Sequence, residues 1–240
     1  MIALIDMDLV CYRTAAGAEN DPVEIAISRM EELFYRILNI VKATEYKAFL
    51  SSNTSFRKKL YPEYKANRTS PKPAHLLALQ EYSQKELKAE IAFEGLEADD
   101  MLAMHQNKET IICSLDKDML QVEGEHFQWA IQGGTLAKRW EKPDTFITQT
   151  KLGGLRHFYT QCLTGDSNDN IKGVAGIGKT KAPKMLEFCE IEQEMFDVVR
   201  EAYGNDDEFL MNASCLWLLR GITDKYENRF KEMINGSNWN

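Results

Sequence analysis

Among the 37 Asp and Glu residues of the 240-residue chain, nine stand in four groups that directly follow strand-like segments or cluster tightly. The groups are Asp6 and Asp8; Glu97, Asp99 and Asp100; Asp116 and Asp118; and Asp166 and Asp169. One such group alone is more often turn chemistry or a helix N-cap than a set of metal ligands. Carboxylates that crowd together repel one another and raise one another's pKa values, and a divalent cation removes that cost. The groups taken together therefore predict bound divalent cations.

The kind of ligand indicates the cation and its chemistry. Carboxylate oxygens without His or Cys favour Mg²⁺ or Mn²⁺ over zinc, and the four histidines, at 75, 105, 126 and 157, are not paired on a helix face. Two cations in one acidic pocket suit phosphoryl chemistry, in which one lowers the pKa of a water molecule and the other stabilises the leaving oxygen. The segment Ile5-Asp6-Met7-Asp8 leaves an alternative open, a phosphatase that uses Asp6 as a covalent nucleophile.

Alternating strands and helices must position these groups. The apolar runs 2–5 and 46–50 predict strands, and helical spacing over Val23–Val41 predicts a helix between them. The pattern recurs with strands over 91–93 and 110–114, a helix over 98–106 and a short helical segment near Lys117. This alternation predicts an α/β fold with a mostly parallel twisted sheet and helices on both faces. Ligands of such sheets lie beyond the carboxyl ends of the strands, so Asp6 and Asp116 are expected at the same edge.

Weaker signals follow in the second half of the chain. The strand-like segments 127–130 and 136–139 flank Gln132-Gly133-Gly134, which predicts a hairpin at the sheet margin. A helix is expected from after Pro143 to about Leu163, and another around Leu216–Leu219.

Composition and charge distribution indicate the class of protein and its partner. With 44% hydrophobic and 28% charged residues the chain is typical of globular proteins, and it has no long apolar run or secretory leader, so we expect a cytoplasmic protein without membrane contact. The net charge is −8, yet residues 42–72 carry eight Lys or Arg against two Glu, and residues 172–184 carry four Lys and no acid. Such cationic segments predict binding to a polyanion.

The first cationic segment also contains aromatic residues. Residues 56–68, FRKKLYPEYKANR, mix five cations with Phe56, Tyr61 and Tyr64. This mixture suits a single nucleic acid strand, with phosphates on the cations and bases stacked on the rings. On a helix, Lys65 and Arg68 would share a face. A solvated charged helix with a tyrosine in the core is the structural alternative.

The second cationic segment is rich in glycine. Residues 173–181, GVAGIGKTK, allow the backbone to approach a phosphate and place Lys179 and Lys181 at the start of a following helix. The spacing of Gly173, Gly178, Lys179 and Thr180 also satisfies a Walker loop. A Walker loop should follow a buried strand, whereas polar turn sequence precedes this one, so a helix-hairpin-helix that grips a duplex backbone is favoured.

Five motifs resemble those of the 5′ nucleases, a family that includes bacteriophage exonucleases, flap endonucleases and the nuclease domain of bacterial DNA polymerase I. They are LIDMD (4–8), YPEYKANR (61–68), GLEADD (95–100), SLDKD (114–118) and TGDSNDNIKGVAGIGKTKA (164–182), in the family's order. The resemblance implies a metal-dependent 5′ to 3′ exonuclease or flap endonuclease. Its expected substrate is DNA with 5′ ends, flaps or nicks, cut near junctions of single and double strand, with an RNA–DNA hybrid as a further substrate. The expected setting is a monomer in a bacterial or phage-infected cell.

The resemblance also implies residue roles. One Mg²⁺ or Mn²⁺ site is implied for Asp6, Glu97, Asp99 and Asp100, and a second for Asp116, Asp118, Asp166 and Asp169. Lys65 and Arg68 match a basic pair of the family's helical arch and are expected to act in catalysis as well as in DNA binding. Arg57 and Tyr64, from the same segment, are expected to contact DNA. Further DNA contacts are implied for the glycine segment, at Gly173, Gly176, Gly178, Lys179 and Lys181.

Two further expectations concern the glycine segment and the domains. A K⁺ ion is implied at the helix-hairpin-helix, held by the backbone of Val174 and Ile177. The expected domains are residues 1–162, an α/β nuclease core with a basic arch segment at about 54–72, and residues 163–240, a helix-hairpin-helix DNA-binding region with C-terminal helices.

One departure from the family pattern bears on activity. The family has another Asp just after the second strand, whereas this chain has Leu50-Ser51-Ser52-Asn53 there. The loss implies weaker binding of the first cation. It also leaves a second function class open, a protein that holds branched DNA without cutting it.

Overall fold

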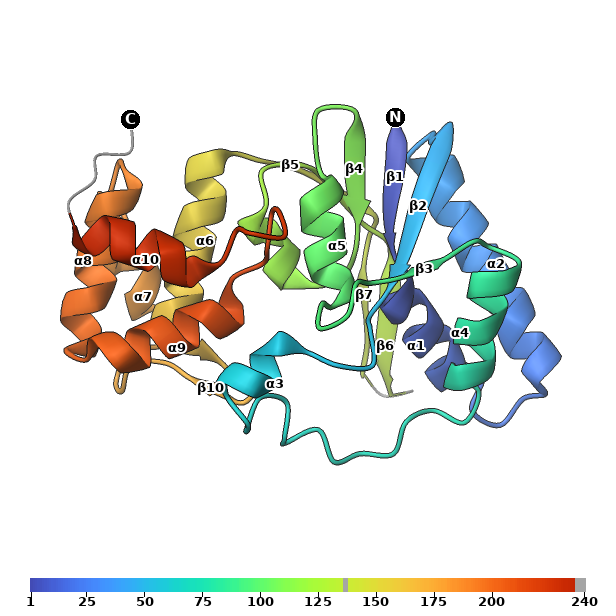
Figure 1. Cartoon of the computed structure of the whole chain (residues 1–240). Coiled ribbons are helices and arrows are strands. Elements are labelled where there is room, and N and C mark those ends of the chain that lie inside the picture. Colours follow the sequence, from blue (N-terminus) through green and yellow to red (C-terminus); the bar gives the residue numbers. More distant parts are fainter. Residues whose placement is uncertain (136–137, 236–240) are drawn as a thin grey trace. The chain divides into compact units, whose positions relative to one another are not determined.

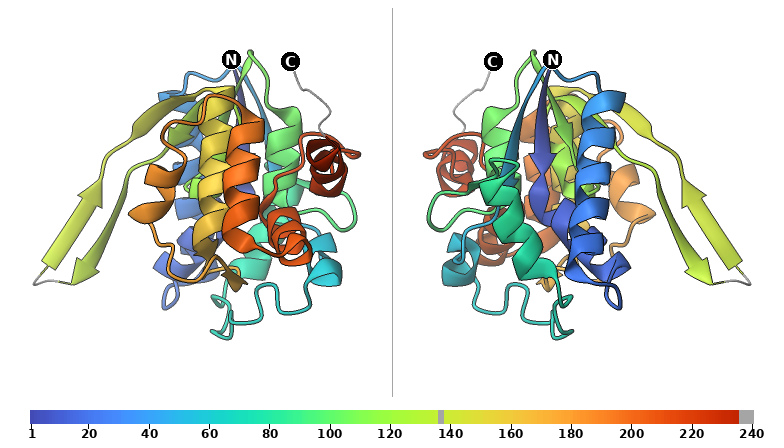
Figure 2. Two further views of the ribbon diagram at one scale, coloured as in Figure 1. Left: turned by 90° about the vertical axis from the view of Figure 1, so that its left-hand side faces the viewer. Right: turned by 90° about the vertical axis from the view of Figure 1, so that its right-hand side faces the viewer.

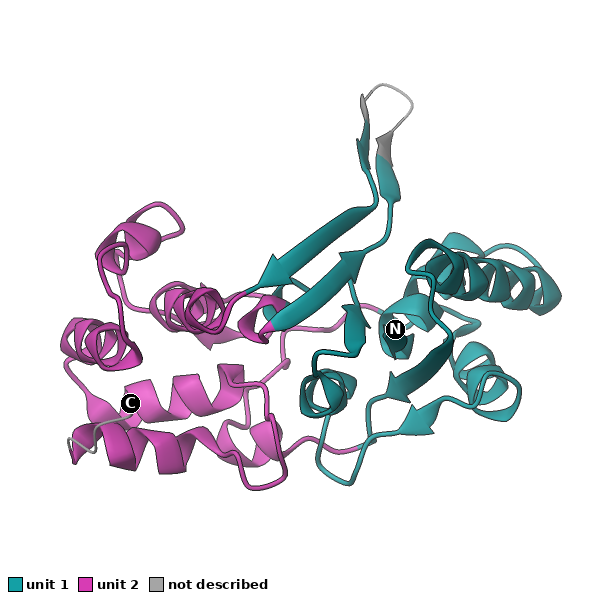
Figure 3. Ribbon diagram, turned by 90° about the horizontal axis from the view of Figure 1, so that it is seen from above, with its two compact units in different colours: residues 1–53, 71–119, 124–149 teal, residues 54–70, 120–123, 150–240 magenta. Residues whose placement is uncertain are grey.

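The computed structural model describes residues 1–135 and 138–235, which belong to two compact units (Figure 3). Unit 1 comprises residues 1–53, 71–119 and 124–149, and unit 2 comprises residues 54–70, 120–123 and 150–240. These units follow from packing, and the expected division of function at residue 163 stays a prediction.

The elements of unit 1 alternate as expected (Figure 1). Its strands are β1 (Ile2–Asp6), β2 (Glu45–Leu50), β3 (Glu90–Ile91), β4 (Thr110–Cys113), β5 (Gly124–Gln128), β6 (Ile131–Thr135), β7 (Lys138–Lys142) and β8 (Thr145–Gln149). Its helices are α1 (Met7–Gly17), α2 (Val23–Ile40), α4 (Leu76–Lys85) and α5 (Ala98–His105), and the 3-10 turn η1 (Lys117–Gln121) begins in it.

The main sheet has the strand order β3-β2-β1-β4-β5-β8. The strands from β3 to β5 are parallel to their neighbours, and only β8 is antiparallel, to β5. The predicted mostly parallel sheet is therefore confirmed. Since β1 and β4 are neighbours and parallel, Asp6 at the end of β1 and the segment after Cys113 lie at the same edge of the sheet.

Both faces of the central strands are buried. In β1, Ala3 and Ile5 point into a core that α1, α2 and α4 share, whereas Leu4, which points to the opposite face, is equally inaccessible. Helix α5 contacts β1 and β2. This double burial explains why the strands are short, uninterrupted apolar runs, and it holds their carboxyl ends in fixed positions.

The hairpin at the sheet margin differs from the prediction. Gly133 and Gly134 do not form its turn; they lie in β6 and pair with Trp140 and Arg139 of β7. Part of the predicted strand 136–139 falls on residues 136 and 137, outside the described residues. In addition, β8 occupies residues after Pro143 that were expected to be helical, so the hairpin continues the antiparallel β5–β8 pair outward.

Unit 2 is built around helices. They are α3 (Phe56–Leu60), α6 (Lys151–Thr164), α7 (Lys181–Met185), α8 (Glu192–Tyr203), α9 (Asp206–Leu216) and α10 (Tyr226–Ile234), with a two-stranded sheet of β9 (Gly165–Asp166) and β10 (Ile171–Lys172). Aromatic rings of α6, α9 and α10 pack together in its interior, among them Phe158, Phe209 and Tyr226. The helix expected around Leu216–Leu219 is wrong, because α9 ends at Leu216.

The expected helical arch is also different in form. Only residues Phe56–Leu60 are helical, and the chain continues in turns over residues 62–67. Lys65 has a positive φ of 58°, which no right-handed helix allows. Lys65 and Arg68 are therefore not on one helix face.

Candidate active site

Asp6 is a buried, hydrogen-bonded carboxylate at the carboxyl end of β1. Its carboxylate is 1% exposed; one oxygen accepts a hydrogen bond from the backbone N–H of Leu9 (3.0 Å), which caps α1, and the other accepts from the hydroxyl of Ser114 (2.6 Å). The N-cap alternative weighed for this motif thus applies to one oxygen of Asp6. Ser114 comes from the end of β4, so the two neighbouring strands are joined at the acidic edge.

Further carboxylates surround Asp6 in unit 1. Its pKa is raised from 3.8 to about 7, above all by burial; the carboxylates of Asp8 and Asp116 also raise it, and the hydrogen bonds from Ser114 and Leu9 lower it. A neighbouring divalent cation would reverse this cost, since it favours the ionised form.

The segment that lacks the family's Asp is tied to the same edge. The backbone N–H of Ser51 donates to Asp8 (2.8 Å), and the hydroxyl of Ser51 accepts from the backbone N–H of Ala98 (3.0 Å). The hydroxyl of Ser52 donates to the carbonyl of Leu96 (2.8 Å). Neutral side chains therefore connect β2 to the start of α5 where the family has a charge.

The GLEADD motif begins α5 with a capping box. The Glu97 side chain accepts from the backbone of Asp100, and the Asp100 carboxylate accepts from the backbone N–H of Glu97 (3.2 Å). Asp100 is fully buried, whereas Asp99 and Glu97 are half-buried. These acids thus stabilise the helix start, and that role does not depend on a cation.

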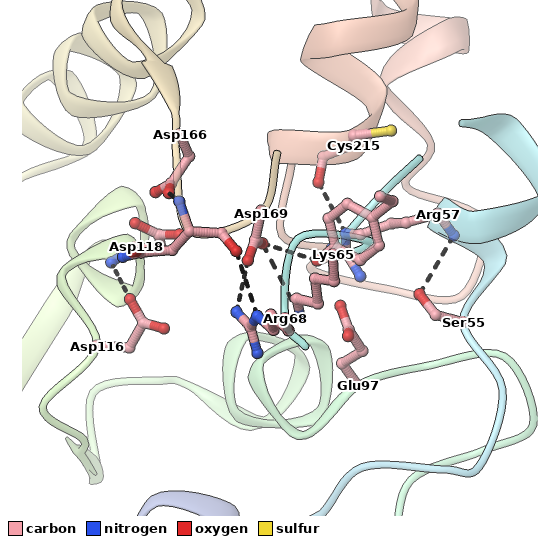
Figure 4. A network of polar contacts seen from close by, with 12 residues as sticks. Ser55, Arg57, Lys65, Arg68, Glu97, Asp116, Asp118, Asp166, Asp169 and Cys215 are labelled. Atoms are coloured by element: carbon pink, nitrogen blue, oxygen red, sulfur yellow. Dashed lines mark hydrogen bonds and ion pairs between the residues drawn. The ribbon is translucent and has the colours of Figure 1, made fainter. Parts of the chain in front are cut away.

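Asp116 and Asp118 lie in the turn after β4 (Figure 4). The backbone N–H of Asp116 donates to Ser114 (3.0 Å), the backbone N–H of Asp118 donates to the Asp116 carboxylate (2.8 Å), and Lys117 pairs with Asp118 (2.9 Å). Ser114 therefore binds Asp6 and also holds the backbone at Asp116, a role that the sequence analysis missed because an isolated serine carries no recognisable signal.

Within residues 1–135 and 138–235, no group of three or more His, Cys, Asp or Glu side chains is arranged so that it could hold a metal ion. The assignment of cation ligands accordingly stays a prediction.

Asp169 is the centre of a polar network in unit 2 (Figure 4). Its carboxylate accepts from the hydroxyl of Tyr64 (2.9 Å) and from Arg68 (2.6 Å), and the ammonium of Lys65 lies 3.9 Å away. The backbone carbonyl of Asp169 accepts from the N–H of Lys65 (3.0 Å). The turn 61–68 and the loop 166–170, about a hundred residues apart in sequence, are thereby joined.

Asp166 begins that loop. It is 5% exposed, and its carboxylate accepts from the backbone N–H of Asn168 (2.7 Å). This bond fixes the tight turn that places Asp169 against Arg68.

Two residues of the basic segment are not at the surface. Tyr64 is 2% exposed, which leaves its ring no face for a base. Arg57 is also 2% exposed and donates to the carbonyls of Cys215 and Trp217, both at 2.8 Å. The sequence assigned direct DNA contacts to both, and their burial does not fit that role; each supports the fold of the segment instead.

The glycine segment connects α6 to α7 in unit 2. Gly165 and Gly173 approach so closely that a Cβ on either would lie 2.3 Å from the backbone nitrogen of the other, and Gly176 has a positive φ of 76°. The carbonyl of Val174, an expected K⁺ ligand, accepts from the N–H of Ile177 (3.1 Å). Lys179 and Lys181 are exposed. Because the segment follows α6 and the short β9–β10 pair rather than a strand of the parallel sheet, it lacks the context of a Walker loop.

Comparison with known proteins identifies the family. Residues 1–151 match the family described as 5′-3′ exonuclease, N-terminal resolvase-like domain. The chain belongs to the 5′-3′ exonuclease family. A 5′-3′ exonuclease of Mycoplasma pneumoniae is 30% identical to this chain over 247 residues, which cover 92% of this chain and 80% of the relative. The predicted 5′ nuclease family is thus confirmed.

Other relatives are longer, and solved structures extend the likeness. The chain spans 14 to 19% of the length of bacterial DNA polymerases I that are 32 to 34% identical over the matched part. T5 5′-exonuclease with bound zinc has a TM-score of 0.63 at 16% identity, and bacteriophage T5 flap endonuclease in a complex with DNA and metal ions has 0.58 at 15%; each match covers 98% of both chains. These structures show that the chain shares their fold. None of its described helices has the length and apolar character needed to cross a membrane.

Proposed function

We propose that this 5′ nuclease hydrolyses phosphodiester bonds of DNA near junctions of single and double strand, as an exonuclease, a flap endonuclease or both, with Mg²⁺ or Mn²⁺. The observation that carries the proposal is the buried Asp6 at the carboxyl edge of the sheet, with Asp8 and Asp116 near enough to raise its pKa. Family membership, the exonuclease relative and the DNA- and metal-bound T5 structures support it.

The residue types at the acidic edge suit hard divalent cations, although the described side chains do not stand together as a formed site. The acidic edge of unit 1 offers carboxylate oxygens and no His or Cys ligand set, and its buried carboxyl is stabilised in the charged form by added positive charge. Asp6, Glu97, Asp99 and Asp100 would hold one cation, and Asp116 and Asp118 would contribute to another; Asp166 and Asp169 of unit 2 remain cation ligands that only the family resemblance implies. Two such cations supply activation of water and neutralisation of charge at the leaving oxygen.

Lys65 and Arg68 are proposed to stabilise the charge that develops at the scissile phosphate. The Asp169 carboxylate forms ion pairs with both Lys65 and Arg68, and the Tyr64 hydroxyl donates a hydrogen bond to Asp169. The two basic side chains are therefore positioned before substrate binds. Arg68 is the more accessible, with 55% of its side chain exposed against 18% for Lys65. We assign Tyr64 and Asp169 as positioning residues for this pair.

The glycine segment is proposed to bind the duplex part of the substrate. Gly176 and Gly178 have open space where a side chain would be, so a phosphate can approach the backbone there, next to the exposed Lys179. A K⁺ ion on backbone carbonyls of this segment, an RNA–DNA hybrid as a further substrate and a monomeric state belong to the same proposal.

A phosphatase with Asp6 as nucleophile is the weaker candidate. Both Asp6 oxygens already accept hydrogen bonds, the side chain is 1% exposed and its raised pKa disfavours the anion that would attack. A protein that binds branched DNA without cutting is the other alternative, motivated by the neutral Ser51–Asn53 segment.

The test is cleavage of labelled 5′-flap, nicked and single-stranded DNA with Mg²⁺, with Mn²⁺ and with EDTA. We expect cleavage only with a divalent cation, products with a 5′-phosphate and a 3′-hydroxyl, and a preference for substrates with a junction. Tight binding of flap DNA without cleavage in either cation would establish the binding protein instead.

A further inference from the structure

The pair β6–β7, described over residues 131–135 and 138–142, forms an arm that projects from unit 1 (Figure 2). In the sequence, the arm lies between the SLDKD motif (114–118) and the TGDSNDN segment (164–170), and it contains no residue of either. Its sequence is therefore not required by the proposed cation chemistry, and another role has to account for it.

The base of the arm is fixed to the body of unit 1. The carboxylate of Asp144 accepts from the backbone N–H of Ala130 (2.6 Å) and pairs with Arg36 of α2 (3.1 Å), so it joins the strand entering the arm to the strand leaving it. Below this point the same two strands continue as the β5–β8 pair of the main sheet. The arm is thus a continuation of the sheet and has a defined direction.

The arm and the acidic edge lie at the same end of the parallel strands of unit 1. Strands β1, β4 and β5 are successive parallel neighbours, and the arm leaves β5 at its carboxyl end. Asp6 and Asp116 follow the carboxyl ends of β1 and β4. A strand of nucleic acid held at this edge of unit 1 would therefore approach the side of the sheet from which the arm extends.

Trp140 on β7 is held in place although it is exposed. It is 47% accessible and is paired directly with Gly133 of β6. A Cβ at position 133 would lie 2.6 Å from the indole Cζ2, so the ring occupies the space that any other residue would fill. One side of the indole therefore packs against Gly133, which holds the ring in position before a partner binds.

The sequence of the arm carries more positive than negative charge. Residues 131–142 include Lys138, Arg139 and Lys142 against one acid, Glu141, which gives a local charge of +2 in a chain of net charge −8. Lys142 is exposed and stands two residues from Trp140 on the same strand, so the two side chains emerge on the same face. This excess of positive charge is complementary to a polyanion such as a nucleic acid strand.

We propose that the arm binds an unpaired segment of the DNA substrate, with a base stacked on Trp140 and an adjacent phosphate on Lys142. The proposal rests on the proposed nuclease function and adds the place where unpaired bases are held. A pre-positioned exposed ring with neighbouring cations is the combination that binds single strands regardless of sequence. The bases inside a duplex cannot offer a face to the ring, so the arm distinguishes unpaired from paired DNA.

The test measures binding in EDTA, where no cutting occurs, with a labelled single-stranded oligonucleotide and a blunt duplex. Trp140→Ala should raise the Kd for the single strand about 5- to 150-fold, equivalent to ~1–3 kcal/mol, and leave the Kd for the duplex unchanged. Trp140→Phe keeps a ring over Gly133 and should retain most of the affinity. Tyr35→Ala, which removes another exposed aromatic of unit 1 (52% accessible), is the matched control and should bind as wild type.

Two further measurements make the result decisive. Lys142→Ala should flatten the salt dependence of single-strand binding by about 0.7 in the log–log slope if its phosphate contact is lost. Equal single-strand affinity of wild type and Trp140→Ala overturns the proposal, as does a wild type that does not bind single strands. A wild-type dimer that Trp140→Ala converts to a monomer, with DNA binding unchanged, assigns the arm to self-association and also overturns it. Because these readouts need no cleavage, an inactive wild type would contradict the nuclease proposal alone.

Discussion

Asp6 has a stabilising set of hydrogen bonds and an unfavourable charge at the same time. Burial and the neighbours Asp8 and Asp116 favour its neutral form in the folded protein, whose pKa is about 7 against 3.8 for an unperturbed carboxyl. The folded state therefore binds a proton that the unfolded state releases between these values. Asp6 contributes stability that is present below about pH 4 and is lost as the pH rises through 7.

This linkage predicts how the cation affects stability. In EDTA the Tm of the wild type should fall between pH 4 and pH 7 relative to Asp6→Asn, because the amide is neutral at every pH and nearly the same shape. Added Mg²⁺ should raise the Tm of the wild type at pH 8 more than that of Asp6→Asn, which keeps the carboxylates of the second proposed site. Thermal unfolding of both proteins over this pH range is the measurement, and equal pH profiles would show that Asp6 is charged in the metal-free fold.

Tyr64 and Asp169 act on Lys65 and Arg68 through position. Removal of the Tyr64 hydroxyl takes a donor from a carboxylate that also orients Lys65 and Arg68. We expect Tyr64→Phe to lower the single-turnover cleavage rate about 10-fold, the lower end for loss of a supporting contact in a metal site, with the Kd for DNA unchanged. Lys65→Ala should lower the same rate further. A Tyr64→Phe variant with the wild-type cleavage rate would show that the Tyr64 hydroxyl does not position Lys65 and Arg68.

At the scale of elements, Arg57 joins helix α3 to the end of helix α9 within unit 2. Its guanidinium supplies donors to the carbonyls of Cys215 and Trp217 at the end of α9, where a cation also interacts favourably with the helix dipole. Arg57→Met leaves these carbonyls without the donors and should cost about 2–4 kcal/mol of unfolding free energy. Lys58→Ala, an exposed change in the same helix, should leave stability unchanged. If Arg57→Met weakened the affinity for DNA without lowering the Tm, the sequence-based prediction that Arg57 contacts DNA would be supported instead.

The glycine segment is the element expected to contact duplex DNA. Changing Lys179 and Lys181 to Ala should weaken binding to duplex-containing substrates and flatten the salt slope by about one unit for each lost phosphate contact. Lys231→Ala, on the exposed face of α10, is the control. Binding of ATP by the wild type that is lost in the double variant would favour the Walker alternative.

The elements show which features the sequence could predict. Strands β1, β2 and β4 are short apolar runs, and α2 has apolar residues at helical spacing, so the local sequence pattern was sufficient to predict these elements. The same pattern predicted that Asp6 and Asp116 follow the ends of strands. The turns after Leu60 were not predictable, because they depend on contacts with residues 167–170, about a hundred positions away. The burial of Arg57 depends on carbonyls even further along the chain. Gly133-Gly134 has the composition of a turn but lies in a strand. Gly133 is required there because the indole of Trp140 occupies the space of a side chain at position 133, which the sequence alone does not reveal.

At the scale of the whole molecule, charge distribution matters more than net charge. A chain of net charge −8 repels DNA on average, and its acidic edge repels phosphate most strongly when no cation is bound. Binding must therefore depend on the local excess of cations in residues 42–72, 131–142 and 172–184. In the absence of divalent cations, removal of one acidic charge at the edge should help DNA to bind.

The last prediction separates binding from cutting on this basis. Asp116→Asn removes one negative charge near Asp6 and keeps an acceptor oxygen for the backbone N–H of Asp118. We expect cleavage of a 5′-flap substrate in Mg²⁺ to be lost, while the Kd for the same DNA in EDTA is unchanged or lower than that of the wild type. Asp166→Asn, in unit 2, should give the same pattern if its carboxylate is also a ligand. Glu227→Gln removes an exposed acid of α10 outside both carboxylate sets and should leave cleavage and binding unchanged. Wild-type cleavage by Asp116→Asn would make the metal assignment wrong, and loss of activity only in Asp6→Asn, together with hydrolysis of small phosphomonoesters by the wild type, would establish the phosphatase.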